Sequence, residues 1–210
     1  MKKFKWLIVC IIILLVSIFL HECGHGIANA ISGIECSTGF NRVGDIYKYP
    51  KDIKFKEEYS KTPDVLLDFG VPCNLLLAIF GSVLCYKSKK EYKQYLGYAI
   101  ASTNSILRLI PCLMVIIIPL VTGSLHKEDE LGTGLLLVQK TGLDFFTFVP
   151  AIISIAISII CIILIILKAK QKGVKHILIY GLLVIVSFVL GMIIANYLDN
   201  IFRINWYAFT

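Results

Sequence analysis

Two histidines and a glutamate stand inside a long apolar stretch near the start of the chain. Residues 21 to 25 read HECGH, an H-E-x-x-H pattern, and residues 6 to 20 before them are almost wholly apolar. Residues four apart lie on one face of a helix, so His21 and His25 are placed to offer one ring nitrogen each to a single metal ion. Titratable groups are costly inside a membrane segment without a partner or function. This setting favours a metal site over a polar helix contact or a channel lining.

The pattern predicts hydrolytic chemistry at a zinc ion. Zinc held by three protein ligands keeps a fourth position for water, lowers the pKa of that water and needs a nearby carboxylate to take its proton. We therefore predict His21 and His25 as zinc ligands and Glu22, which flanks the ion without ligating it, as the general base. The spacing supplies everything except a third ligand.

The third ligand is expected in the only strongly acidic cluster after the motif, residues 122 to 132. This cluster follows the third apolar segment. A carboxylate of this cluster can reach the membrane depth of the histidines if the motif lies on the same side of the membrane as the end of that segment. An acidic surface loop or a helix start is the alternative, because carboxylates also favour helix N-termini.

Composition places the chain among membrane proteins. Of its 210 residues, 57% are hydrophobic and 17% are charged, and the mean hydropathy is +0.79. Lys and Arg outnumber Asp and Glu by 21 to 14. The lysines lie in short loops between apolar segments, which is the pattern that sets membrane orientation. We therefore expect a multi-pass protein of the cell membrane with the lipid bilayer as a partner and no nucleic acid; the oligomeric state stays open.

Five apolar segments are each long enough to cross a hydrocarbon core of roughly 30 Å. The sequence predicts an all-α polytopic membrane protein, a single domain over residues 1 to 210. The first three spans and the acidic cluster form a catalytic core of about residues 6 to 135, and the last two spans, within about 146 to 197, shield it from lipid. The first span is retained, because it continues into the motif instead of ending at a cleavage site. The five spans cover about residues 6 to 31, 65 to 86, 95 to 121, 146 to 167 and 177 to 197.

The loops between the spans give further expectations. Lysines gather at residues 2 to 5, 87 to 93 and 168 to 175, on one side of a five-span arrangement. By the positive-inside rule the N-terminus is cytoplasmic and the motif opens towards the exterior. In the 35 to 65 loop, period-two alternation predicts a small β-hairpin over residues 45 to 56, with a solvated loop as the alternative. An interfacial aromatic anchor is predicted from Tyr197, Phe202, Trp206 and Tyr207.

The seven cysteines do not indicate a disulfide framework, because their number is odd and no short-range pairs occur. All except Cys36 fall in or at the ends of apolar segments, so only Cys36 is expected to be exposed. Cys23 lies two residues beyond His21 and points to another side of the helix, so it is predicted to be a packing residue.

Polar residues inside the second and third spans suggest positioning roles. Asn74 lies deep in an apolar helix and should face protein or a wet cavity, with a structural hydrogen bond as the alternative. Arg108 needs a carboxylate, carbonyls or water at its depth. It is placed to steady a substrate carbonyl or to pair with Asp68, with extension to an interface as the alternative.

The first 135 residues resemble the site-2 protease family of intramembrane zinc metallopeptidases. The HECGH sequence matches that family's H-E-x-G-H on a membrane helix. Residues 70 to 74, GVPCN, look like its G-P-x-x-N element with one residue fewer between proline and asparagine. The order of Asn104, Pro111 and Asp129 is similar to its asparagine, proline and ligand-aspartate element, with a longer gap before the aspartate.

This resemblance implies peptide-bond hydrolysis within or beside the bilayer, with a membrane protein or peptide as substrate. It implies His21, His25 and Asp129 as zinc ligands with Glu22 as the general base. It also implies that Asn74 positions substrate and that the 45 to 56 segment accepts a substrate strand by edge pairing. The resemblance implies a site open to the cytosol, whereas the charge rule points outward, so the side stays open. Alternatives for the third ligand are Glu128, Glu130, His126 and Asp68.

Two other classes of protein accommodate the same motif. A non-catalytic membrane regulator or scaffold would retain it and bind partners through the same grooves. A metal or ion transporter would use His21, Glu22 and Asp129 as a transient ion path. The transporter predicts polar positions on successive spans, of which this sequence has few.

Overall fold

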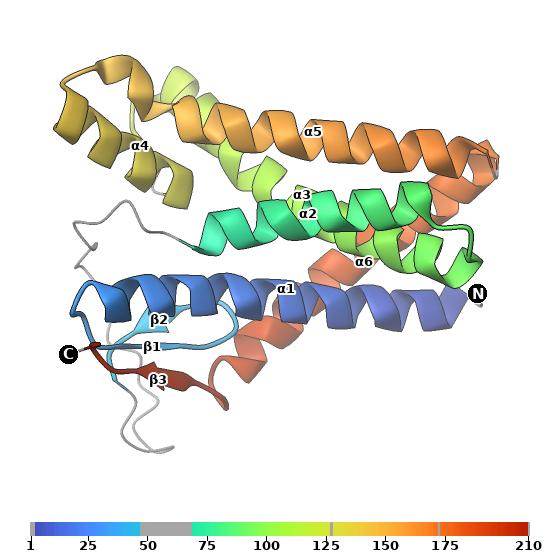
Figure 1. Ribbon diagram of the computed structural model, residues 1–210, viewed down its shortest axis with the longest axis horizontal. Helices are drawn as coiled ribbons and strands as arrows, with labels where there is room; N and C mark the ends of the chain where they lie inside the picture. The colour runs from blue at the N-terminus through green and yellow to red at the C-terminus, as the bar shows by residue number, and fades with distance from the viewer. Residues whose placement is uncertain (1–2, 47–68, 127, 172, 210) are drawn as a thin grey trace.

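The computed structural model describes residues 3–46, 69–126, 128–171 and 173–209, and it is mostly helical (Figure 1). Within these ranges lie six α-helices, one short 3-10 helix and three short strands. In chain order they are α1 Lys3–Ile31, β1 Cys36–Thr38, β2 Val43–Gly44, α2 Gly70–Lys87, α3 Glu91–Thr122, α4 Asp129–Thr141, η2 Asp144–Thr147, α5 Val149–Lys170, α6 Val174–Leu198 and β3 Ile204–Trp206.

Five of the helices, α1, α2, α3, α5 and α6, are long and apolar enough to cross a membrane. The predicted fold class, an all-α polytopic membrane protein with about five spans and a small β element, is confirmed. The chain is thus a multi-pass membrane protein by the length and composition of its helices. The predicted second span began near residue 65, whereas α2 begins at Gly70 and residues 65–68 lie outside the described ranges.

The membrane helices pack closely because small residues stand where two helices cross. A Cβ atom added to Gly81 of α2 would lie 2.5 Å from the backbone nitrogen of Ala101 on α3, and one added to Gly97 would meet the backbone of Cys85. Helix α1 packs against α2, α3 and α6, and α3 also packs against α5. Small residues at such crossings are typical of helix packing in lipid, where close backbone approach replaces the hydrophobic driving force.

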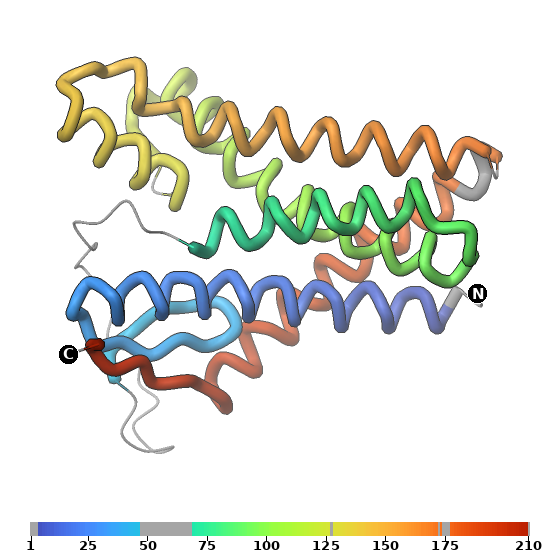
Figure 2. The backbone as a smooth tube through the Cα atoms, in the orientation of Figure 1, coloured from blue at the N-terminus to red at the C-terminus, as the bar shows by residue number. Residues whose placement is uncertain are grey.

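The two ends of the bundle differ in character. The start of α1, the α2–α3 turn, the end of α5 and the start of α6 lie at one end of the bundle, as the backbone trace shows (Figure 2). These are the segments that carry the lysine clusters, so their predicted gathering on one side agrees with the structure. The last turns of α1, the start of α2, helix α4 and the strands lie at the opposite end (Figure 1).

The strands form one antiparallel sheet in the order β2-β1-β3. Strand β1 pairs with β2 in the register Ser37↔Gly44 and with β3 in the register Ser37↔Asn205. A hairpin in the 35 to 65 loop is therefore present, but its strands precede the predicted ones. The predicted hairpin over residues 45 to 56 falls almost wholly on residues outside the described ranges.

Strand β3 was not predicted, and it gives Trp206 a different environment from the expected aromatic anchor. The Trp206 Nε1 donates a hydrogen bond to Thr38 Oγ1 at 2.8 Å, and its indole covers the position where Gly26 lacks a side chain. The other three aromatic side chains, those of Tyr197, Phe202 and Tyr207, remain exposed. The C-terminal strand thus packs on the motif helix.

The expectation that Cys36 is exposed is wrong, because this residue is buried in β1, the central strand of the sheet. All seven cysteines are free, in agreement with the prediction of no disulfide framework. Cys23 is half-buried and lies within hydrogen-bonding reach of Thr38, so it faces the sheet, on another side of the helix from the histidines.

Candidate metal centre

The site is built on the last third of α1, where the helical repeat brings His21 and His25 to one face. Their rings lie at 86° to each other with centroids 4.6 Å apart, and their Nε2 atoms are 3.1 Å apart. His21 is buried and His25 is partly exposed. Two ring nitrogens therefore converge on one point at the sheet end of the bundle.

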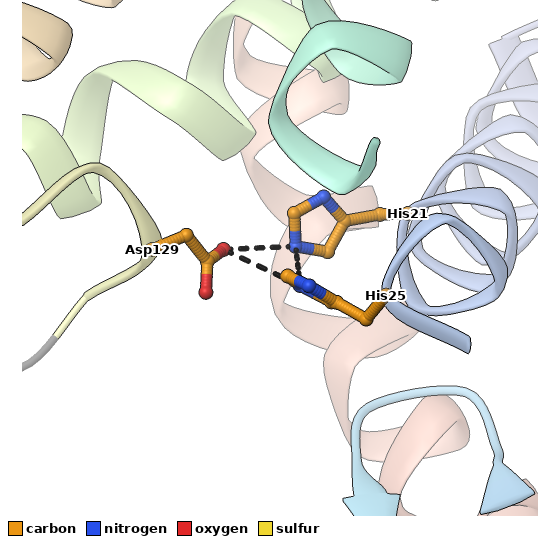
Figure 3. Close-up of side chains that lie close together, drawn as sticks. All are labelled: His21, His25 and Asp129. Atoms are coloured by element: carbon orange, nitrogen blue, oxygen red, sulfur yellow. Dashed lines mark hydrogen bonds and ion pairs between the residues drawn. The ribbon is translucent and has the colours of Figure 1, made fainter. Parts of the chain in front are cut away.

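Asp129 completes this cluster from more than a hundred residues further along the chain (Figure 3). Its Oδ2 lies 3.0 Å from His21 Nε2 and 3.6 Å from His25 Nε2. The three donor atoms all lie within 4.8 Å of one another. Asp129 thus starts helix α4, as the alternative interpretation of the acidic cluster expected, and it also faces the histidines. Its role as a metal ligand stays a prediction.

Helix α4 is held in place by its own contacts. It begins at Asp129, packs on η2 and α5, and brings the backbone of Gly134 against the carbonyl of Thr147. Because Asp129 and Glu130 stand in its first turn, their carboxylates are favoured there by the free N–H groups of the helix.

The other acidic candidates face elsewhere. Glu128 pairs with His126 at 3.2 Å, and Glu130 is buried against Arg108 at 3.5 Å. Asp68 lies outside the described residues. Within the described ranges, the group with metal-ligand geometry is therefore that of His21, His25 and Asp129.

The donor set fits a zinc ion. Tetrahedral zinc with ligands at about 2.0–2.1 Å separates its ligand atoms by about 3.3 Å. The three separations here are 3.0, 3.1 and 3.6 Å. Two imidazoles and one carboxylate also leave one of the four positions for water or substrate, as in catalytic zinc sites.

Asp129 is held in its ionised form. Burial by itself would raise the pKa of this carboxyl, but hydrogen bonds and charge from His21 and His25 hold it well below its usual value. An ionised carboxylate is the form that binds a metal ion.

Glu22 follows His21 directly and is 9% exposed. It lies close enough to His21, His25 and Asp129 to interact with each of them electrostatically. Its place directly after His21 in the motif is the one that the sequence predicts for a general base. The catalytic role itself stays a prediction.

The motif glycines allow other parts of the chain to approach the histidines. A Cβ atom on Gly24 would lie 2.5 Å from the backbone nitrogen of Gly70 and 2.6 Å from the carbonyl carbon of Phe69. A Cβ atom on Gly70 would lie 2.8 Å from the ring of His21. The start of α2 is thus packed directly on the motif turn.

We expect Gly24→Ala to destabilise the fold, because the added methyl group meets backbone atoms that cannot rotate away. Overpacking of this kind costs about 1–3 kcal/mol, which lowers the midpoint of thermal unfolding in detergent by several degrees. Gly132→Ala in α4 is the matched control. Its Cβ meets no heavy atom within 4 Å, so it should raise stability by about 0.5–1 kcal/mol. Equal midpoints for the two variants would contradict the close packing of α1 and α2.

Asn74 takes part in a buried polar network between three helices. Its Nδ2 donates to Asn104 Oδ1 at 2.9 Å and to the carbonyl of Ser17 at 3.3 Å. Asn104 Nδ2 in turn donates to Ser17 Oγ at 3.0 Å. These bonds make Asn74 a helix contact, the alternative that the sequence left open. A role in substrate positioning stays a prediction.

Arg108 does not extend to an interface, since it is 6% exposed. Its Nη1 lies 3.3 Å from Asp129 Oδ2 and 3.5 Å from Glu130 Oε1. The carboxylates that this arginine was predicted to need are therefore those of α4. Its predicted contact with substrate remains untested.

Sequence reasoning missed Asp199, a buried carboxylate at the end of α6. Its Oδ1 accepts hydrogen bonds from the backbone nitrogens of Phe40 at 2.8 Å and Asn41 at 3.2 Å, and Arg42 and Arg203 pair with its Oδ2. It thus ties the β1–β2 turn to the C-terminal segment. The available signal was an aspartate at the end of an apolar span with an arginine four residues later.

Fold and site together define a class: a multi-pass helical membrane protein in which two imidazoles and a carboxylate from distant parts of the chain converge, with a buried glutamate directly after the first imidazole in the sequence. No family model, curated protein or solved structure matches the chain.

Proposed function

We propose that this protein is a membrane-embedded zinc metalloprotease of the site-2 protease type. The observation that carries the proposal is the convergence of Asp129 on the two motif imidazoles, with separations that suit tetrahedral zinc. A chance H-E-x-x-H pattern would not require a carboxylate 108 residues away to meet it.

In this proposal His21, His25 and Asp129 would hold a zinc ion. Zinc bound there supplies an acidified water molecule and polarises a substrate carbonyl. Glu22 takes a proton from the attacking water and later donates it to the leaving amine, so that one carboxylate serves as both base and acid. Its low exposure and its electrostatic interaction with His21, His25 and Asp129 support this role.

The substrate is a membrane-associated or transmembrane peptide. Supporting this, His21 and His25 lie on α1, a helix long and apolar enough to span a membrane, and the last turns of α1 lie at the end of the bundle that also carries the sheet (Figure 1). A helical substrate has its carbonyl groups bonded internally and must unwind before cleavage. We therefore expect preference for helices with weak formers, such as glycine or proline, near the cut.

The experiment uses the purified full chain in detergent with two model transmembrane peptides. One contains a Gly-Pro pair, and the other has two leucines at the same positions. We expect cleavage of the first, seen by mass spectrometry, to exceed that of the second. A zinc chelator should abolish cleavage and added zinc should restore it. Cleavage that persists after the zinc has been removed would contradict the proposal, and so would ion flux in liposomes without any cleavage.

A further inference from the structure

A buried ionic cluster lies directly behind Asp129. Arg108 of α3 is 6% exposed and Glu130 of α4 is 1% exposed. A single guanidinium nitrogen, Nη1, faces both Asp129 Oδ2, at 3.3 Å, and Glu130 Oε1, at 3.5 Å. One cation is thus shared by two neighbouring carboxylates, only one of which belongs to the proposed metal site.

The shared oxygen is the one that faces the histidines. Asp129 Oδ2 accepts from Arg108 and also lies 3.0 Å from His21 Nε2. Arg108 is itself fixed, because its Nε donates to the carbonyl of Leu107 at 3.1 Å. The arginine therefore determines where this oxygen points, in the way that partners of metal-ligating groups usually do.

Charge explains the presence of Glu130. A buried guanidinium needs a counter-charge. If Asp129 were its only partner, the ion pair would compete with a metal ion for the same oxygen. Glu130 lies against Arg108 at 3.5 Å and is not part of the group with metal-ligand geometry, so it supplies a second negative charge to Arg108. The group of Asp129, Glu130 and Arg108 then keeps one net negative charge.

We propose that Arg108 is a positioning residue for Asp129 and that Glu130 neutralises Arg108, so that Asp129 keeps its charge for a divalent cation. This inference rests on the proposed metal site. It adds two residues to the site that do not touch the ion, and it gives Arg108 a role other than contact with substrate.

The test measures zinc affinity of the full chain in detergent by competition with a chromophoric chelator. Glu130→Gln keeps the shape of the side chain and removes its charge, so Asp129 becomes the only charged partner of Arg108 in this cluster. We expect zinc affinity to fall about 10–100-fold, as is typical when a partner of a ligand is changed. Adding Arg108→Gln in the same chain restores the charge balance. The double variant should bind zinc more tightly than Glu130→Gln and within about 10-fold of the wild type.

Glu128→Gln is the matched control. It removes the same charge from the other neighbour of Asp129, but Glu128 pairs with the partly exposed His126. We expect a change of less than about 5-fold, the range of surface ion pairs. Arg108→Lys gives an independent variant if Glu130→Gln fails to fold. It keeps the charge and removes the guanidinium, and it should bind zinc about 10-fold more weakly.

The outcomes separate this inference from the proposed function. Wild-type protein that binds no zinc would overturn both. Wild-type binding with unchanged affinity in Glu130→Gln or Arg108→Lys would overturn the inference alone. A double variant that binds zinc more weakly than Glu130→Gln would also overturn it, because damage that accumulates indicates a purely structural role for the pair.

Discussion

Glu22→Gln is expected to abolish most peptide cleavage while the chain keeps its zinc. Glu22 follows His21 and interacts electrostatically with His21, His25 and Asp129, but it is not one of the three donor residues. Loss of a general base typically costs about 10²–10⁴-fold in rate, and the amide cannot take a proton from water. Cleavage of the Gly-Pro transmembrane peptide and the zinc content of the same preparation are the two measurements.

The same substitution at the other end of the bundle provides the control. Glu91 is exposed in the first turn of α3, so Glu91→Gln should leave cleavage unchanged. A Glu22→Gln protein that cleaves at the wild-type rate would remove Glu22 from the mechanism. If cells that depend on the protein behave normally with this variant, a non-catalytic regulator becomes the better explanation.

Asp129→Asn is expected to remove zinc from the purified chain. The amide retains the shape of the side chain, but it is a poor zinc ligand and carries no charge. Loss of a direct ligand should exceed the roughly 10–100-fold effect of changing a ligand's partner, so we expect a decrease in zinc affinity of at least about 100-fold. Chelator competition on protein in detergent measures it.

The comparison with Glu128→Gln makes this result specific. The two residues are adjacent, yet only Asp129 faces the imidazoles, whereas Glu128 faces His126. If Glu128→Gln loses zinc and Asp129→Asn keeps it, the ligand assignment is wrong by one residue, although a metal site at the motif would survive.

The membrane helices were predictable because a long apolar run of this length is costly to expose to water and is typical of a membrane-spanning helix. Each described span lies close to the predicted one, for example Val149–Lys170 against residues 146 to 167. Helix α4 was predicted only as an alternative, a helix start in the acidic cluster. It is short and contains two glycines, Gly132 and Gly134, and its start was visible only as a cluster of acids. Packing on η2 and α5 decides its position, and packing cannot be seen in a local pattern.

The sheet shows the same limit more clearly. Strands β1 and β3 are only three residues long and are separated by more than 160 residues, so neither carries a useful periodic signal. The burial of Cys36 follows from that long-range pairing. Because Cys36 stands among polar residues in the sequence, we expected it to be exposed, which is wrong.

The two halves of the candidate site were predicted on different grounds: the histidines from spacing, and Asp129 only from the resemblance to the site-2 protease family. Helical spacing alone places His21 and His25 on one face. Spacing cannot decide which acid of residues 128 to 130 turns towards them. That choice depends on where α4 begins and on the partners of the other two acids. Glu130 pairs with Arg108, and Glu128 pairs with His126.

X-ray absorption at the zinc edge tests the central claim most directly, on wild-type protein purified without chelators. We predict bound zinc with nitrogen and oxygen ligands at about 2.0–2.1 Å, from two imidazoles and one carboxylate, and no sulfur. An absence of zinc would contradict the account. Sulfur at about 2.3 Å would do so too, because it would mean that a cysteine such as Cys23 binds the ion.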